Sequence, residues 1–189
     1  MKGKPIYWII SCWLFVFILN IYGWADKKMI SLILPHHLDK LLINICGTYK
    51  IQRLDDLNNI GDFKDFFIGK GVNNPGLAEG DFDGNGLRDY AVLVRKCPKS
   101  TRGLFIVFLQ VKKGQFQFAY IRLESFIDDI GISIEKPGIF EESGGTFGPG
   151  STKKVNVENE SILFCNIKAC EIIYWDPKYK GLFEMWVSG

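Results

Sequence analysis

One short segment of the sequence carries side chains that could bind a hard metal ion. Side chains with an oxygen atom stand at relative positions 1, 3, 5 and 9 of this segment, as Asp81, Asp83, Asn85 and Asp89. Calcium in proteins takes roughly six to eight oxygen ligands, often from a tightly curled loop. Gly86, at position 6, permits the sharp reversal that such a loop needs, and the backbone carbonyl of Leu87 can supply a further ligand. The spacing therefore predicts a calcium site formed by these four side chains and the Leu87 carbonyl.

The same residues could instead form a turn without metal, closed by hydrogen bonds from the Asx side chains to the backbone. Electrostatics favours the metal, because carboxylates about 4–6 Å apart repel by roughly 3–4 kcal/mol per pair at an effective dielectric constant near 20. Arg88 is the one cation next to them in the sequence, and we expect its side chain to point elsewhere. The prediction is therefore a structural calcium ion.

The segment differs from an EF-hand and resembles another calcium loop. Position 12 is Val92, where an EF-hand has a bidentate Glu, and a strand-forming run follows Asp89. The pattern resembles the calcium loop of FG-GAP/VCBS-type repeats, Asp-x-Asp/Asn-x-Asp-Gly-x-x-Asp followed by a β-strand. The C-terminal segments 173–176 and 184–188 also look like the end of small exported bacterial proteins that carry one such repeat and have no assigned activity.

The resemblance implies the calcium loop alone. The loop occurs once, whereas a propeller built from these repeats needs several blades of comparable sequence. Asn85 replaces an Asp of the pattern, which removes one charge and should weaken the site. We therefore expect a calcium loop within another fold, without the ligand binding of the propellers.

The elements that must position this loop are one helix and a series of strands. Leu38, Leu41, Leu42 and Ile45 recur at helical spacing, which predicts an amphipathic helix over 35–46 that ends at Gly47. Apolar runs separated by turns predict strands at 90–95, 104–111, 115–123, 130–135, 153–158, 161–166, 169–175 and 182–187. Because helices do not alternate with strands, the predicted class is α+β, with an N-terminal helix packed on a mainly antiparallel sheet.

The strand predicted at 115–123 shows a period-two pattern. Larger side chains occupy every second position, at Phe116, Phe118, Tyr120 and Arg122. This alternation predicts that one face of the strand is packed and the other is partly solvated.

The N-terminal sequence predicts an export signal over residues 1–25. Lys2 and Lys4 precede an uncharged, apolar run, and Gly23-Trp24-Ala25 forms a small-x-small cleavage pattern. Two alternatives are an uncleaved membrane anchor and lipidation at Cys12. Cleavage would leave 189 − 25 = 164 residues, a single domain at 26–189, with 23 − 2 = 21 basic and 21 acidic side chains. We expect a periplasmic or extracellular location, or anchoring to the inner membrane if the segment is retained.

Four cysteines remain beyond the signal, an even number that suits an oxidising compartment. Three pairings are possible, and we favour Cys46–Cys97 with Cys165–Cys170, because the second bond would clamp a tight turn between two strands. The alternative is four buried free thiols. Their spacing resembles no zinc site.

The sequence contains none of the common catalytic motifs, such as Gly-x-Ser-x-Gly or His-Glu-x-x-His. The leading prediction is a non-enzymatic exported domain that binds an unknown protein or a cell-envelope component. An envelope hydrolase with carboxylate chemistry is the alternative, and a membrane-anchored envelope protein is a third possibility. The net charge of +2 gives no support for nucleic-acid binding, and we expect membrane contact only through the N-terminal segment if it is uncleaved.

Overall fold

A computed structural model describes residues 34–58, 60–98, 102–142 and 153–187. All of them except Leu34 belong to one compact unit, Pro35–Gly189. The predicted signal at 1–25, its Cys12 and the start of the predicted domain at 26–33 lie outside the described residues. Among the described helices, none has the length and apolar character needed to span a membrane.

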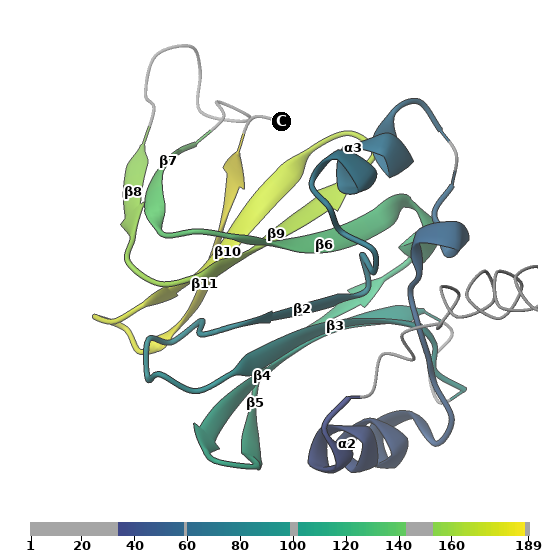
Figure 1. Ribbon diagram of the computed structural model, residues 1–189, viewed down its shortest axis with the longest axis horizontal. Coiled ribbons are helices and arrows are strands. Elements are labelled where there is room, and N and C mark those ends of the chain that lie inside the picture. Colours follow the sequence, from purple (N-terminus) through teal and green to yellow (C-terminus); the bar gives the residue numbers. More distant parts are fainter. Residues whose placement is uncertain (1–33, 59, 99–101, 143–152, 188–189) are drawn as a thin grey trace, which may run out of the picture. The chain divides into compact units, whose positions relative to one another are not determined.

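Two antiparallel sheets and one hairpin make up this unit (Figure 1). The first sheet has the order β1-β3-β4-β5, and β2 also pairs with β3. Its strands are β1 (Lys50–Ile51), β2 (Leu77–Gly80), β3 (Asp89–Lys96), β4 (Gly103–Lys112) and β5 (Gln115–Glu124).

The second sheet has the order β11-β10-β9-β6, and β7 pairs with β8 in a separate hairpin. The strands are β6 (Ile130–Glu135), β7 (Gly138–Glu141), β8 (Lys154–Val157), β9 (Ser161–Asn166), β10 (Cys170–Asp176) and β11 (Gly181–Val187). All eight predicted strands are present. The prediction of a mainly antiparallel α+β chain is confirmed at this level, although the sheet is divided in two.

The main core lies between the two sheets. Alternate side chains of β3 and β4 point into it and meet side chains from β6, β9 and β10, as period-two strands dictate. Its fully buried members include Leu93, Phe105, Val107, Ile132 and Ile162. A second cluster, with Phe67, Leu163 and Ile172, fills the opposite face of the second sheet.

Short helices accompany the sheets: α2 (His36–Cys46), α3 (Phe63–Gly69) and the 3-10 turns η1 (Leu54–Asp56) and η2 (Ile127–Asp129). The α2 helix follows Pro35 and ends at Gly47, whose positive φ of 83° suits glycine. It buries Leu38, Leu42 and Cys46. Leu41 and Ile45, predicted on the same face, are half-buried.

A bulge interrupts the alternation predicted for β5. Val107 of β4 lies opposite Tyr120, whereas the next residue of β4, Phe108, lies opposite Phe118, so Ala119 is an extra residue in β5. A bulge moves all later side chains to the other face. Phe116 and Phe118 therefore point outward, while Tyr120 and Arg122 point toward the second sheet.

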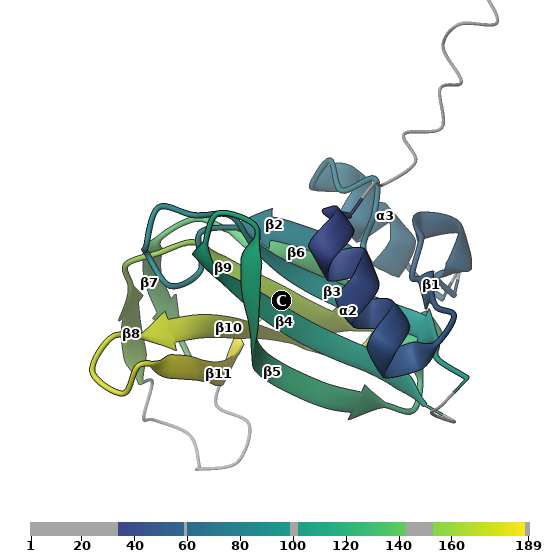
Figure 2. The same ribbon diagram turned by 90° about the horizontal axis from the view of Figure 1, so that it is seen from below.

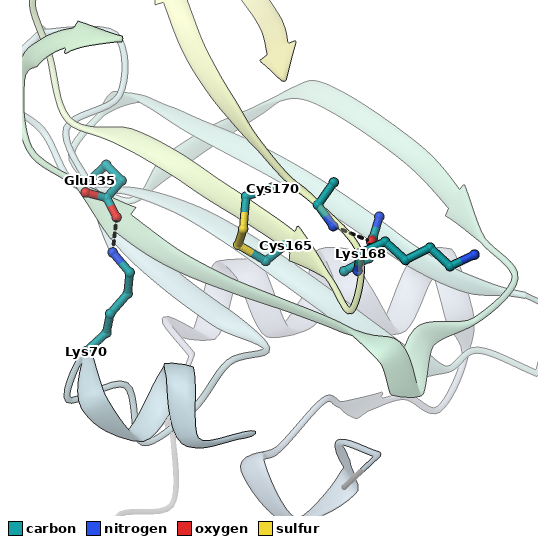
Figure 3. Close-up of a disulfide and its surroundings, with 7 residues drawn as sticks. Lys70, Glu135, Cys165, Lys168 and Cys170 are labelled. Carbon is teal, nitrogen blue, oxygen red and sulfur yellow. Dashed lines mark hydrogen bonds and ion pairs between the residues drawn. A yellow bond between two sulfur atoms is a disulfide. The ribbon is translucent and has the colours of Figure 1, made fainter. Parts of the chain in front are cut away.

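The four cysteines in the described part of the chain pair as Cys46–Cys97 and Cys165–Cys170, which is the pairing favoured from the sequence. The first bond ties the end of α2 to the residue after β3. The second joins opposed residues of β9 and β10 across their turn (Figure 3). Oδ1 of Asn166 closes the same turn by accepting hydrogen bonds from the backbone N–H groups of Lys168 and Ala169, at 2.8 and 3.0 Å.

An ion cluster joins the two sheets near their β5 and β11 edges. The guanidinium of Arg122 contacts Glu124 (2.5 Å), the buried Glu171 and Glu184 (3.1 Å), and it lies over the ring of Phe164 at 4.0 Å. Burial raises the pKa of Glu171 despite the neighbouring guanidinium. Burial, with a hydrogen bond donated to Glu184, raises the pKa of Tyr120 to about 12.

Candidate metal centre

The predicted calcium loop connects β2 to β3. Both ends are fixed, because Gly80 and Asp89 lie opposite each other in the ladder of these two strands. The chain reverses between them through Gly84 and Gly86, whose φ angles of 74° and 79° lie in the left-handed region. The position 6 glycine therefore has the role expected from the sequence.

Three of the predicted ligands come together. One carboxylate oxygen from each of Asp81, Asp83 and Asp89 lies within 4.8 Å of the others. Asp81 and Asp83 are half-buried, and Asp89 is fully buried. This is a compact set of hard oxygen donors from one loop, the ligand type that calcium prefers.

Backbone N–H groups hold each carboxylate in place. Oδ2 of Asp81 accepts a hydrogen bond from the N–H of Gly86 at 2.9 Å, and Oδ1 of Asp83 accepts one from Asn85 at 3.2 Å. Asp89 is held more firmly, since its two oxygens accept hydrogen bonds from Phe82 and Gln110, each at 2.7 Å. A carboxylate oxygen has two lone pairs, so these bonds orient the carboxylates and leave lone pairs available.

Burial makes the charged form of the cluster costly. It raises the pKa of Asp89 to about 6, and the hydrogen bonds from Gln110 and Phe82 only partly offset this effect. The pKa of Asp83 is also raised, first by burial and then by the charge of Asp81. A divalent cation among the three carboxylates would remove this cost.

One oxygen of the cluster lacks a protein partner. Oδ1 of Asp81 is buried and makes no hydrogen bond within the described part of the chain. A buried acceptor without a partner lowers the stability of the fold by about 1–3 kcal/mol. A donor or a bound ion at Oδ1 of Asp81 would remove this cost. The residues present therefore fit a bound cation on structural grounds.

Asn85 contacts one carboxylate of the cluster, and the N–H of Leu87 contacts Asn85. The amide nitrogen of Asn85 donates to Oδ2 of Asp83 (3.1 Å) and to the carbonyl of Gln110 (2.9 Å). The amide oxygen accepts a hydrogen bond from the N–H of Leu87 at 2.7 Å. Asn85 thus contacts the carboxylate of Asp83 through its nitrogen, and rotation of the amide would be needed to make its oxygen a ligand.

Residues distant in sequence fix the loop from outside. Oε2 of Glu160 accepts a hydrogen bond from the N–H of Asp81 at 2.9 Å, and Asn159 donates to the carbonyl of Phe82 at 3.4 Å. A Cβ atom at Gly84 would lie 2.6–2.9 Å from the Asn159 amide. The turn between β8 and β9 therefore packs against the loop, and no local sequence pattern predicts this contact. Arg88 turns away to Glu79 at 3.2 Å, as expected.

Comparison of the chain with protein families, with characterised proteins and with solved structures gives no significant match. The resemblance of the loop to FG-GAP/VCBS repeats therefore stays a hypothesis that depends on the residues of the loop.

Proposed function

We propose that this chain is an exported, non-enzymatic α+β domain whose loop at 81–89 binds a structural calcium ion. In this proposal α2 packs on the first sheet, and the domain binds an unknown protein or cell-envelope partner. The observation that carries the calcium site is the gathering of three carboxylates, one of which, that of Asp81, has a buried oxygen (Oδ1) without a partner in the described part of the chain. Two cysteine pairs support an oxidising compartment.

The ion would act on stability because the loop contributes to the core. Phe82, between two of the carboxylates, is fully buried in the cluster between the sheets. The ion would bind Asp81, Asp83 and Asp89 and would neutralise their mutual repulsion. It would thereby hold Phe82 in the core and the β8–β9 turn against the loop.

Thermal unfolding with and without calcium tests the site. After chelation, millimolar Ca²⁺ should raise the melting temperature, while Mg²⁺ should substitute poorly, because it requires near-octahedral geometry and dehydrates reluctantly. Asp81→Asn should abolish the increment, since the amide keeps an acceptor for the Gly86 N–H but lacks the charge. Asp55→Asn is the control, because that carboxylate is almost fully exposed and lies outside the loop. A melting temperature unaffected by calcium at neutral pH would contradict the proposal.

The partner and the absence of catalysis need a separate test. We expect the chain, bound to a matrix, to retain a specific protein or envelope component, and to do so less well after chelation. Turnover of a hydrolase substrate that is lost on mutation of a single acid would favour the envelope hydrolase instead.

A further inference from the structure

The turn between β8 and β9 places a carboxylate at the start of the calcium loop. Oε2 of Glu160, which is half-buried, accepts the hydrogen bond from the N–H of Asp81 at 2.9 Å. A Cβ atom at Gly80 would lie 2.9 Å from the same oxygen, so the glycine leaves room for the carboxylate. The fold thus brings an acid from 79 residues away to the first ligand residue of the loop.

A second residue of the same turn contacts the loop. Asn159 donates to the carbonyl of Phe82 at 3.4 Å, and the side chain of Phe82 is fully buried. The loop and the turn lie at the end of the sheets that carries the β7–β8 hairpin (Figures 1 and 2). The contacts of Glu160 and Asn159 fall on consecutive residues of the loop, so the positions of the turn and the loop depend on each other.

Glu160 adds a fourth negative charge beside the three carboxylates of the loop. It lies outside the group formed by Asp81, Asp83 and Asp89, whose oxygens lie within 4.8 Å of one another. Within the described residues, none of the ion pairs includes any of these four acids. When all four are ionised, a divalent cation among the loop carboxylates would neutralise only half of their charge. The charge of Glu160 would therefore favour the bound ion.

We propose that Glu160 is a positioning residue of the calcium site, which raises the affinity for the ion without contacting it. This inference rests on the calcium site proposed above. The hydrogen bond from Asp81 holds a ligand residue in place, and the negative charge of Glu160 attracts the ion through space. A unit charge about 7 Å from a divalent ion changes the dissociation constant roughly threefold to tenfold in water, depending on screening by salt.

The coupling between the ion and the turn acts in both directions. If the packed turn raises the affinity for calcium, bound calcium must stabilise the packed turn by the same factor. Calcium should therefore slow hydrogen exchange of the Asp81 N–H and of the amides at 158–160. This protection should be smaller in a chain that lacks the charge of Glu160.

Calcium titration of Glu160→Gln tests this inference. The amide oxygen keeps an acceptor for the Asp81 N–H, whereas the charge is removed. The chain is expressed from Met1, purified in the form that accumulates, freed of metal by chelation and titrated with CaCl₂ in a calorimeter. We expect a dissociation constant roughly threefold to tenfold above that of the natural chain. This ratio should approach one in 1 M salt, where the Debye length is about 3 Å.

The stability of the metal-free chain separates this role from a structural one. Without calcium, Glu160→Gln should change the melting temperature by less than about 2 °C, because the weaker hydrogen bond and the relieved repulsion oppose each other. Glu158→Gln is the matched control, since it is the same substitution at an exposed position of the same turn. It should change the dissociation constant less than about twofold.

Each contrary result has a separate meaning. If the natural chain binds calcium and Glu160→Gln binds it equally well, this inference is wrong and the calcium site remains. A melting temperature lowered equally with and without calcium, at an unchanged dissociation constant, would assign Glu160 a structural role instead. An equal rise of the dissociation constant in both variants would attribute the effect to net charge and contradict a role specific to Glu160. A natural chain that binds no calcium would overturn the proposed site and this inference together.

Discussion

Replacing Asn85 with Asp separates a calcium loop from a metal-free turn. The amide nitrogen of Asn85 donates to Oδ2 of Asp83 at 3.1 Å and to the carbonyl of Gln110 at 2.9 Å. Asn85→Asp removes both donors and adds a further negative charge beside Asp83 and its neighbouring carboxylates. Without metal, both changes destabilise the folded state.

The size of the loss follows from these contacts. Two like charges about 4 Å apart repel by about 1 kcal/mol at the dielectric constant of water, which is the lower limit for a pair with one exposed and one half-buried member. Each lost hydrogen bond costs about 1 kcal/mol. The metal-free variant should therefore lose about 2–3 kcal/mol of unfolding free energy. With calcium, the added carboxylate becomes a ligand, and the ion should bind at least tenfold more tightly, which is worth about 1.4 kcal/mol.

The assay is denaturant unfolding in chelator and in millimolar Ca²⁺, on the variant and on the natural chain. The calcium-dependent increment in unfolding free energy should be larger for Asn85→Asp than for the natural chain. Asn156→Asp is the control, since it is the same substitution at an exposed position of β8. If Asn85→Asp lost the same free energy in both solutions, the loop would be a turn without metal.

Two further outcomes follow from other parts of the fold. Removing the Cys46–Cys97 bond, which spans 51 residues, should lower the free energy of unfolding in denaturant by about 4 kcal/mol. Removing the Cys165–Cys170 bond, which spans 5, should lower it by about 2 kcal/mol. Equal losses would contradict the explanation by loop entropy. Because the pKa of Tyr120 is raised to about 12 in the folded chain, the unfolded chain loses the phenolic proton at lower pH. The contribution of Tyr120 to stability is therefore full below pH 10 and declines as pH rises from 10 to 12. A difference titration of tyrosinate absorbance against Tyr120→Phe should show one component missing near pH 12.

Long periodic segments of the fold were predictable from the sequence, and short ones were not. The prediction of β9 at 161–166 agrees to the residue, because an apolar run stands between clear turns. In contrast, β2 (Leu77–Gly80) and β7 (Gly138–Glu141) escaped prediction. Four residues contain too few apolar positions to show a period. The ladder with β3 defines β2, and that partner lies beyond any local window.

The bulge in β5 shows a second limit. The alternation of Phe116, Phe118, Tyr120 and Arg122 is regular in the sequence, yet the structure divides these side chains between two faces. The sequence around Ala119 contains no pattern that predicts a bulge. The buried partners of Arg122 in the other sheet, Phe164 and Glu171, require its side chain to point inward. Tertiary contacts thus override the period.

The candidate site divides in the same way. The spacing of Asp81, Asp83 and Asp89 was sufficient to predict their convergence, because a single tight loop holds all three. Glu160 accepts a hydrogen bond from the N–H of Asp81, which lies 79 residues away, and no pattern in the sequence indicates that contact. The hydrogen bond from the N–H of Gln110, in β4, to Asp89 can likewise be inferred only once the pairing of the strands is known.

These distant contacts decide what the loop can do for the molecule. Asp81 receives support from the β8–β9 turn through Glu160, and Asp89 from β4 through Gln110, so opposite ends of the loop are held by different sheets. Phe82 lies between them in the shared core. An ion that draws Asp81 and Asp89 together therefore also draws the two sheets together. Both contacts exist without an ion, so a bound ion would add a direct link between Asp81 and Asp89 to them, and for this reason we expect calcium to act on cooperative unfolding of the whole domain.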